Sequence, residues 1–268
     1  MKIEVDLKST SVDFIDVYWE VQGGYESALN IKYTVLRGES SEGPFDTVAE
    51  DLVDRFHIRD YIAPRKRVWR NLYYVVQATL QDGTVHKSIA RNLTARPPLD
   101  ALEMVRLNGL LFREYSGRPV LVYPLRTFGD RCSNCFDTVT GRRLVGNCRN
   151  CYNTGYSRGY HYPIYAYAKL NPEQRQTQAT DSIITQQAQI QGRMSIYPLL
   201  KVGDLIVEQE GTRWRVQSLS MTERLRSPVQ QMFVVSRIPA GDIEYQIPVN
   251  WDDSVKTSPK SFSPRSSV

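Results

Sequence analysis

The chain has 268 residues, of which 41% are hydrophobic and 24% charged, and its formal net charge is +5. These proportions are typical of a globular protein and exclude a disordered chain, while the length favours two or three compact units. No apolar run approaches the roughly 20 residues that cross a bilayer, and residues 1–6 lack the apolar core of a signal peptide. We therefore expect a protein with no membrane partner that stays in a cytoplasm. The basic residues are spread along the chain, so the charge alone indicates no particular partner.

Residues 1–96 alternate apolar and polar side chains in the manner of β-strands. Turn signals separate the runs at residues 23–24, 38–44 and 82–83. Several short strands with this spacing predict an antiparallel β-sandwich. The side chains that share one face of their strands are Val17, Trp19, Val21, Ile31, Tyr33, Val35, Leu72, Tyr74, Val76 and Ala78.

The same segment carries a more specific pattern. Trp19 lies on an early expected strand, and residues 33–37 are followed by a Gly-Pro-Phe run at residues 43–45. Residues 73–78 then close on a turn. In these features the segment resembles a fibronectin type III domain, which implies a role in adhesion or spacing and no catalysis. Residues 60–70 depart from the family pattern, because they form a basic connection where a shorter link is usual.

Residues 97–125 are predicted to form a helical connector between two β units. Pro97 and Pro98 suit the start of a helix, and Gly117 suits its end. The predicted helix covers residues 99–115. Its apolar stripe is expected to comprise Leu99, Leu102, Val105, Leu107 and Leu110.

Residues 126–165 contain all four cysteines of the chain, arranged as two Cys-x-x-Cys knuckles. A knuckle turns two sulfur atoms toward one point, so two knuckles supply the four thiolates of a closed tetrahedral zinc site. Four sulfur ligands leave no open position for a water molecule, and the zinc of this small ribbon-like module is therefore predicted to be structural. The predicted ligands are Cys132, Cys135, Cys148 and Cys151.

Other uses of the four cysteines are less favoured. Two disulfides do not suit a cytoplasmic protein, and a redox pair would need a thioredoxin-like βαβ pattern that neither knuckle has. Iron stays open as the metal, because tetrahedral sulfur sites accept zinc or iron. His161 is not needed as a further ligand, and we expect it to be a surface or packed histidine.

The zinc module is also basic. A basic ribbon with tyrosines nearby can track a phosphate backbone or stack on bases. Arginine is equally suited to protein interfaces, and we expect an interface in preference to nucleic-acid binding. The basic residues concerned are Arg126, Arg131, Arg142, Arg143, Arg149 and Arg158.

Residues 166–250 alternate again and predict a small β-barrel, which makes the expected fold class mainly β and multidomain. A Gln-rich arm at residues 171–191 and a flexible tail at residues 251–268 carry too little apolar surface to order alone. The residues that mark the four expected strands are Met194 and Ile196, Leu205 and Val207, Trp214 and Val216, and Phe233 and Val235.

Recognisable catalytic signals are missing from the sequence. The three histidines lie in different segments, and no Gly-x-Ser-x-Gly motif, phosphate-binding loop or dinucleotide fingerprint occurs. The carboxylates are scattered without a paired pattern. We therefore expect a protein that is not an enzyme.

The cysteine segment and the expected barrel also carry a joint pattern. Residues 140–143 read Thr-Gly-Arg-Arg between the knuckles, and residues 154–156 read Thr-Gly-Tyr after them. Residues 202–207 and 211–216 read Val-Gly-Asp-Leu-Ile-Val and Gly-Thr-Arg-Trp-Arg-Val. The runs at residues 140–143 and 154–156, together with the two knuckles, resemble a cysteine-rich module of tailed-bacteriophage virion proteins. The runs at residues 202–207 and 211–216 are similar to the small β-barrels of phage head-closure and head-to-tail joining proteins, which usually lack an N-terminal type III domain.

This resemblance implies a structural virion protein, a ring subunit at the head-tail interface that acts as a neck, connector, head-closure or adaptor protein. Its partners would be other copies of itself in an oligomeric ring and the portal, neck or tail proteins, with incidental contact to packaged DNA. It would be found in the virion neck or tail after assembly in the cytoplasm of the bacterial host. A tail or baseplate component stays open as an alternative. A nucleic-acid-binding zinc-ribbon protein is a less favoured one, and its affinity would fall steeply with salt.

Overall fold

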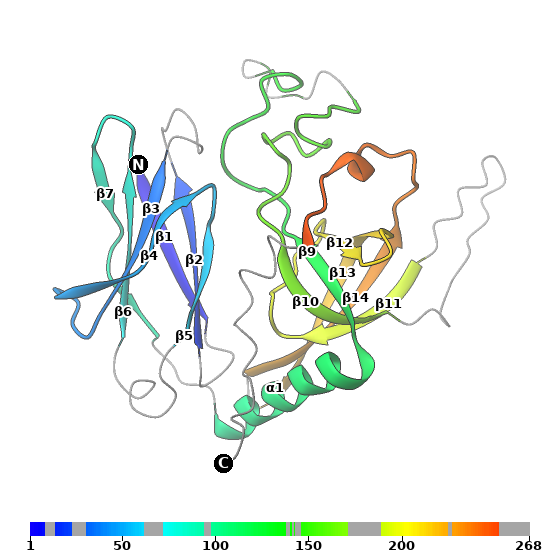
Figure 1. The fold of residues 1–268 in the computed structure, drawn as a ribbon, viewed down its shortest axis with the longest axis horizontal. Coiled ribbons are helices and arrows are strands. Elements are labelled where there is room, and N and C mark those ends of the chain that lie inside the picture. Colours follow the sequence, from blue (N-terminus) through cyan, green and yellow to red (C-terminus); the bar gives the residue numbers. More distant parts are fainter. Residues whose placement is uncertain are drawn as a thin grey trace, which may run out of the picture. The chain divides into compact units, whose positions relative to one another are not determined.

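A computed structural model gives the fold, and the chain is mainly β (Figure 1). The residues that it describes are 1–8, 14–22, 31–61, 72–93, 98–137, 140, 142, 146–170, 189–224 and 227–251. The expected flexible tail beyond Trp251, most of the Gln-rich arm, Arg143 and most of the basic connection lie outside these described residues.

The chain divides into two compact units, each built from separate stretches of the sequence. The first unit comprises Met1–Leu107, Arg126–Tyr162 and Glu223–Val229. The second unit comprises Asn108–Leu125, Pro163–Thr222 and Gln230–Val268. The cysteine segment therefore belongs to the same unit as the N-terminal sheets.

Two antiparallel sheets make up the N-terminal part of the first unit. The first sheet has the order β1-β2-β5, from β1 (Lys2–Lys8), β2 (Phe14–Gln22) and β5 (His57–Tyr61). The second has the order β4-β3-β6-β7, with β8 also paired to β6, from β3 (Lys32–Gly38), β4 (Phe45–Val53), β6 (Tyr73–Thr79), β7 (Val85–Lys87) and β8 (Arg91–Asn92). Val5 lies opposite Trp19 in the first sheet, and Val35 lies opposite Val76 in the second.

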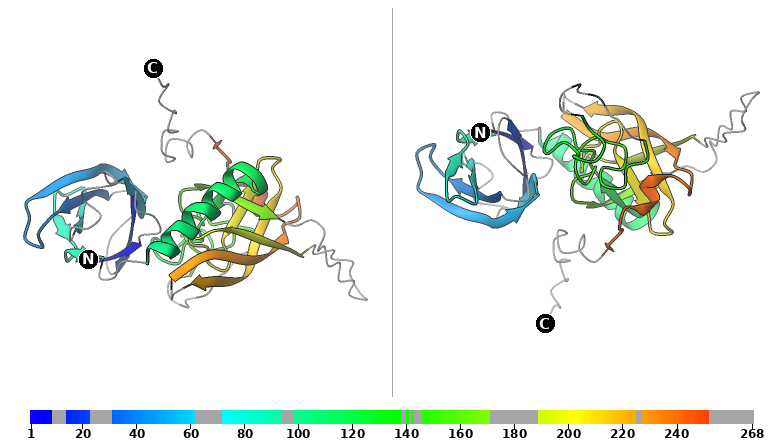
Figure 2. Two further views of the ribbon diagram at one scale, coloured as in Figure 1. Left: turned by 90° about the horizontal axis from the view of Figure 1, so that it is seen from below. Right: turned by 90° about the horizontal axis from the view of Figure 1, so that it is seen from above.

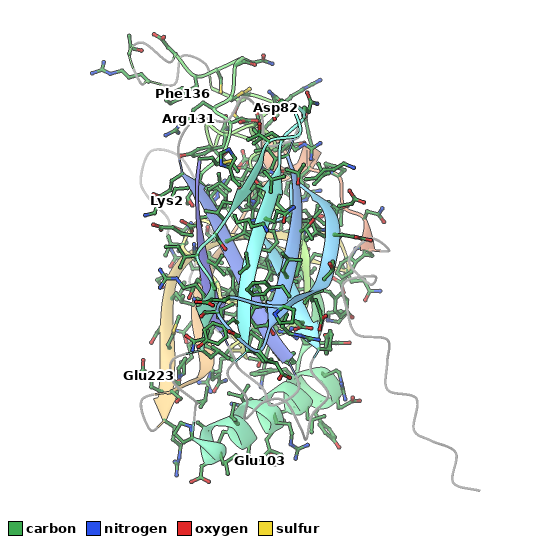
Figure 3. All side chains as sticks on the ribbon, turned by 90° about the vertical axis from the view of Figure 1, so that its left-hand side faces the viewer. Lys2, Asp82, Glu103, Arg131, Phe136 and Glu223 are labelled. Carbon is green, nitrogen blue, oxygen red and sulfur yellow. The ribbon has the colours of Figure 1, made fainter. Side chains whose placement is uncertain are left out.

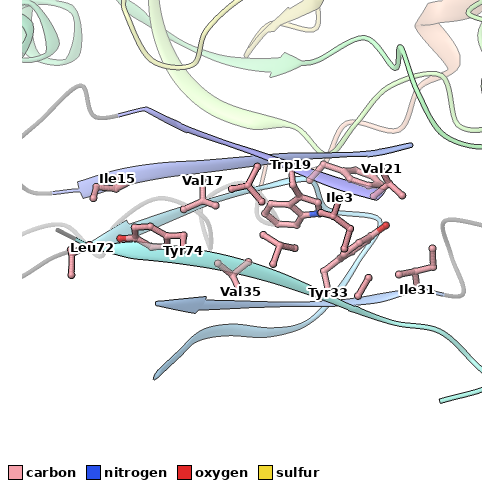
Figure 4. Packing of buried hydrophobic residues seen from close by; sticks show 14 residues of the cluster. Ile3, Ile15, Val17, Trp19, Val21, Ile31, Tyr33, Val35, Leu72 and Tyr74 are labelled. Carbon is pink, nitrogen blue, oxygen red and sulfur yellow. The ribbon is translucent and has the colours of Figure 1, made fainter. Parts of the chain in front are cut away.

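The two sheets share one hydrophobic core (Figure 4). Trp19 and Val17 of β2 are buried against Tyr33 of β3 and Tyr74 of β6, and the Trp19 and Tyr33 ring centroids are 5.7 Å apart. All ten side chains that the alternation placed on shared strand faces are buried, which confirms this pattern. The period of two in the sequence is thus the period that separates core from solvent.

The predicted helix at residues 99–115 is observed as α1 (Leu99–Leu111) followed by one π-helical turn, η2 (Phe112–Ser116). Its end at Gly117 is confirmed: the Gly117 N–H donates to the Phe112 carbonyl at 2.9 Å. A Cβ at this position would lie 2.4 Å from that oxygen, so a side chain does not fit there.

The expected apolar stripe of this helix is wrong in part. Leu102 and Val105 are buried, together with Ala101, but Leu99 and Leu107 are 60% and 51% exposed. Fewer apolar side chains of this helix are buried than its leucine content indicates, because leucine also favours helix formation at exposed positions.

The second unit contains a closed antiparallel barrel with the order β10-β11-β14-β13-β12-β9 (Figure 2). Its strands are β9 (Arg118–Tyr123), β10 (Ile164–Leu170), β11 (Gln189–Ser195), β12 (Leu205–Glu208), β13 (Arg213–Arg224) and β14 (Ser227–Arg237), and a short 3-10 helix, η4 (Ile243–Gln246), follows them. The barrel core includes Val120, Met194, Ile206, Trp214 and Phe233.

The barrel begins earlier in the chain than predicted. Strand β9 lies inside residues 97–125, which were expected to be only a helical connector, and it pairs with both β10 and β12. The sequence of β9 does not alternate, because Val120, Leu121, Val122 and Tyr123 are all buried. A strand buried on both faces gives no period-two signal. The cysteine segment therefore lies in the chain between two neighbouring barrel strands.

Candidate metal centre

The four predicted ligands converge on one point. The Sγ atoms of Cys132 and Cys148 are 3.7 Å apart, those of Cys135 and Cys151 are 3.1 Å apart, and all four lie within 4.8 Å of one another. These distances exceed the roughly 2.05 Å of a disulfide. A tetrahedron with 2.3 Å bonds has its sulfur atoms roughly 3.8 Å apart. The Cys132–Cys148 distance is close to this value, and the Cys135–Cys151 distance is shorter. All four side chains are buried, and together they can bind a metal ion.

Each knuckle is closed by a backbone hydrogen bond. The Phe136 N–H donates to the Cys132 carbonyl at 3.0 Å, and the Tyr152 N–H donates to the Cys148 carbonyl at 2.9 Å. In the second knuckle the Asn153 Oδ1 also accepts from the Cys148 N–H at 3.2 Å. Tyr152 and Asn153 both have positive φ, and asparagine adopts this region more readily than most residues. The sequence after Cys148 thus supports the tight turn that orients its sulfur.

The two knuckles are also joined to each other. The side-chain amide of Asn150, inside the second knuckle, lies 3.6 Å from the Sγ of Cys132 in the first. The Cys132 N–H donates to the Gly155 carbonyl at 3.0 Å. Hydrogen bonds to metal-ligating atoms orient the ligands and tune the site. Polar groups of the second knuckle and of the residues after it therefore help to hold Cys132 in place.

Burial and backbone hydrogen bonds shift the thiol pKa of Cys148 in the opposite direction from those of Cys135 and Cys151. Burial alone would raise the pKa of Cys148, but the N–H groups of Asn150 and Cys151 lower it to about 7. Burial raises the pKa of Cys135 and of Cys151 above the ordinary thiol value. A metal ion must displace the remaining protons, so binding here releases protons and strengthens with pH.

Arg131 packs against two aromatic rings of the cysteine segment, which contains few aliphatic side chains. Its guanidinium lies 4.6 Å from the ring centroid of Phe136 and 4.1 Å from that of Tyr156, and Figure 3 labels Arg131 and Phe136. Arg131 and Tyr156 also form an isolated β-bridge. Such cation–π contacts attract the guanidinium to the ring faces and stabilise this packing.

Three of the six arginines that form the predicted basic surface make contacts within their own unit. Arg131 stacks on two rings, Arg126 is buried, and Arg126 and Arg158 both pair with one carboxylate. Within the described part of the chain, Arg131, Arg142, Arg149 and Arg158 are exposed, whereas Arg126 is buried.

Arg126 and Arg158 share the carboxylate of Asp54. This aspartate follows β4 and was not predicted as a site residue. Its Oδ2 accepts hydrogen bonds from the Arg126 Nη2 and from the Arg158 Nη1, the latter at 2.8 Å. Asp54 is buried and has a positive φ of 57°. A single aspartate after a strand carries no sequence signal for such a role.

Aromatic rings extend this contact. The Phe56 ring packs edge-on against Phe128, with the centroids 4.8 Å apart, and against His161 at 5.3 Å. Phe128 also packs against the core between the two sheets. Of the two roles expected for His161, surface or packed, the packed role is the one observed.

Comparisons with known proteins give little information. No family model matches the chain, and no curated protein matches it. The solved structures that it resembles include two crystal structures of pectate lyase Pel3 from Pectobacterium carotovorum, at 20% and 18% identity and TM-scores of 0.30 and 0.28. Each match covers 37% of this chain and 28% of the lyase chain, so this chain spans little more than a quarter of that length.

These matches correct the expectation that the chain is not an enzyme, because both solved structures carry the name of an enzyme. The missing sequence motifs were too weak a basis for that exclusion. A TM-score of 0.30 does not establish an activity for this chain either.

A separate expectation concerned membranes: no helix among the described residues is long and apolar enough to span one.

Proposed function

We propose that Cys132, Cys135, Cys148 and Cys151 hold one structural zinc ion. The support is the donor set, which consists of four buried thiols that face one point. Zinc accepts four thiolates in tetrahedral geometry and has no redox chemistry of its own. Iron would accept the same sulfurs, and the two metals differ in absorption spectrum and in elemental analysis.

The N-terminal sheets are best described, within this proposal, as a fibronectin type III-like sandwich. The support is the strand order, β1-β2-β5 in one sheet and β4-β3-β6-β7 in the other, around a core that contains Trp19. Fibronectin type III domains share the two-sheet architecture of the immunoglobulin class. Such a domain serves as a spacer or an adhesive surface.

For the whole chain the proposal is a structural protein of a tailed-bacteriophage virion, a ring subunit at the head-tail interface. The observation that carries it is a closed barrel whose β9 and β10 flank a four-cysteine segment, because barrel and cysteine module are the two features that the sequence resemblance combines. In a ring, one head-to-tail interface repeats around the axis. The partners would be further copies of the chain and the portal, neck or tail proteins.

Location within a particle tests this proposal. An epitope tag on the chain, detected by gold-labelled antibody on purified particles in the electron microscope, should mark the neck between head and tail. The same tag on a capsid protein serves as the control, and it should mark the head. Label at the tail tip would contradict a neck position and favour the baseplate alternative. Particles that lack the chain altogether would refute a virion role.

The nucleic-acid alternative has less support, because Arg126, Arg131 and Arg158 are engaged within their own unit. A nucleic-acid-binding ribbon should show an affinity for duplex DNA that falls steeply between 50 and 200 mM salt, on the order of 10³-fold or more. The ring subunit should bind DNA weakly at every salt concentration.

A further inference from the structure

We propose that Asp54 is a positioning residue of the four-cysteine centre and that it helps to set the affinity of this centre for metal. Asp54 lies outside the cysteine segment, in the turn between β4 and β5. The inference rests on the metal centre proposed above and names a determinant of its affinity. Two chains of contacts, one through each arginine, connect Asp54 to the sulfur ligands.

The first chain passes through Arg158. The Asp54 Oδ2 accepts from the Arg158 Nη1 at 2.8 Å, and the Arg158 N–H donates to the Asn150 carbonyl at 2.8 Å. Asn150 in turn places its side-chain amide 3.6 Å from the Cys132 Sγ. Arg158 has a positive φ of 65°, a conformation that needs outside support in a residue with a long side chain. The ion pair with Asp54 supplies such support.

The second chain passes through Arg126. Its Nη2 donates to the Asp54 Oδ2, its Nε donates to the Tyr160 carbonyl at 3.0 Å, and its N–H donates to the Gly159 carbonyl at 3.1 Å. Gly159 lies so close to the second knuckle that an added Cβ would be 2.6 Å from the Cys151 carbonyl oxygen. A shift of Arg126 therefore reaches Cys151 through backbone contacts.

Burial makes the Asp54 carboxylate difficult to replace. The side chains of Asp54 and Arg126 are 5% and 3% exposed, so neither charge is hydrated. Removing one partner of a buried pair leaves the other charge unpaired, and that charge then moves toward water or distorts its surroundings. For Arg126 such a move would break its hydrogen bonds to Gly159 and Tyr160. Loss of the Asp54 charge should therefore displace the second knuckle.

The neighbours of Asp54 extend the coupling to the core between the sheets. The Arg55 guanidinium lies 4.7 Å from the ring centroid of Tyr162, and Phe56 packs on Phe128. The Phe56 carbonyl accepts a hydrogen bond from the backbone N–H of Trp19 at 3.1 Å. Coupling between two sites is reciprocal in free energy. If Asp54 strengthens metal binding, bound metal must stabilise this turn to the same extent.

The test is Asp54→Asn in the full chain, because asparagine has the same shape and tolerates the positive φ. The matched control is Asp51→Asn: Asp51 also has a positive φ, of 53°, but it is exposed, and its Oδ1 pairs with the Lys32 Nζ at 2.9 Å. Zinc affinity is measured by competition with a chromophoric chelator, and Co²⁺ serves as a spectroscopic probe of the four-thiolate geometry. Asp54→Asn should weaken zinc binding about 10-fold and alter the Co²⁺ spectrum, while Asp51→Asn should leave both unchanged.

A second pair of variants guards against misfolding of Asp54→Asn. The Arg158 side chain is half exposed, so Arg158→Gln should fold and weaken zinc binding severalfold. Its effect should be less than additive with that of Asp54→Asn, because both substitutions disrupt the Asp54–Arg158 ion pair. Arg158→Lys, which keeps the charge, should recover part of the affinity. In the wild type, zinc removal should speed hydrogen exchange at the Trp19 amide.

The outcomes separate this inference from the metal centre itself. A wild-type chain that binds neither zinc nor Co²⁺ would refute the centre, and the inference with it. A wild-type chain that binds zinc, together with Asp54→Asn and Arg158→Gln variants that bind it equally tightly, would refute only the positioning role of Asp54. The same holds if zinc removal leaves exchange at the Trp19 amide unchanged.

Discussion

Tyr74 of β6 donates its hydroxyl to Asp60 of β5 at 2.7 Å, and this hydrogen bond joins the two N-terminal sheets. Arg37 of β3 donates to the same carboxylate oxygen at 2.8 Å. Burial, followed by the neighbouring Asp60 charge, raises the pKa of Tyr74 above its ordinary range, so the phenol stays protonated and remains a donor. A buried carboxylate on one sheet is thus held by two donors on the other.

This arrangement predicts unequal effects of two substitutions. Tyr74→Phe removes one hydrogen bond but leaves Asp60 paired with Arg37, and it should lower the free energy of unfolding by about 1–2 kcal/mol. Asp60→Ala leaves the Arg37 charge and the Tyr74 hydroxyl without their acceptor, and it should lower it by about 3 kcal/mol or more. Denaturant unfolding, followed by tryptophan fluorescence, measures both values. Equal losses would contradict the shared-acceptor arrangement.

The metal centre predicts one zinc ion per wild-type chain. Cys148→Ser removes one of four ligands and should lower the content to below about 0.1 ion per chain, because structural sites need the complete set. Ser133→Ala is the control, since Ser133 lies in the first knuckle but is exposed and is no ligand. Elemental analysis of the purified proteins decides the matter. Disulfide-linked cysteines in the wild type, or zinc retained by Cys148→Ser, would refute the assignment.

Gly192 in β11 predicts a strict limit on size in the barrel. A Cβ there would lie 2.3 Å from the Phe233 Cε2 and 2.9 Å from the Leu170 Cδ2. Gly192→Ala should therefore destabilise the barrel by about 1–3 kcal/mol through overpacking. Gly109→Ala, in α1 with open space around it, should instead be neutral or stabilise by up to about 1 kcal/mol. Thermal unfolding of both variants compares the two, and a stable Gly192→Ala would show that Phe233 can move aside.

Asp204 predicts a pH dependence of stability. Burial raises its pKa from 3.8 to about 6, although its oxygens accept from the Leu125 N–H at 2.8 Å and the Lys201 N–H at 2.7 Å. Since the folded chain holds this proton more tightly than the unfolded chain, the contribution of Asp204 to the free energy of unfolding should fall as the pH rises from about 4 to about 6. Two pKa units correspond to at most about 3 kcal/mol.

Asp204→Asn removes this titration. The difference in unfolding free energy between the variant and the wild type should therefore change between pH 4 and 6 and stay level above about pH 7. Denaturant unfolding at several pH values measures that difference, so other titrating groups cancel. A difference that is constant from pH 4 to 7 would show that Asp204 has an ordinary pKa in the folded chain.

Local patterns predicted much of the fold. Period-two alternation identified the core face around Trp19 and Tyr33, and a proline start with a glycine end located α1 and η2. The cysteine spacing predicted that the four thiols face one point, and the structure brings them together there. Each of these signals depends on residues close together in the chain, which is why sequence carries them.

Features that depend on distant residues were missed. Strand β9 has no alternation because both its faces are buried, so its sequence gives no strand signal within the predicted helical connector. Asp54 lies about 70 residues before Arg126 and about 100 before Arg158, and the sequence does not encode that they meet. The cysteine spacing predicted a separate module, whereas the aromatic and ionic contacts of Phe56 and Asp54 join the cysteine segment to the N-terminal unit.

The position of the cysteine segment between β9 and β10 has a consequence for chain entropy. About 40 residues separate the two strands, yet Ile164 lies directly opposite Val122 in the barrel. Closing a loop of that length costs about 2 kcal/mol more than closing a four-residue hairpin turn. A metal ion that ties the cysteines together shortens the free length of the loop and offsets part of this cost. To the barrel the whole segment is one long hairpin connection, so a short turn between Tyr123 and Ile164 should close the same barrel.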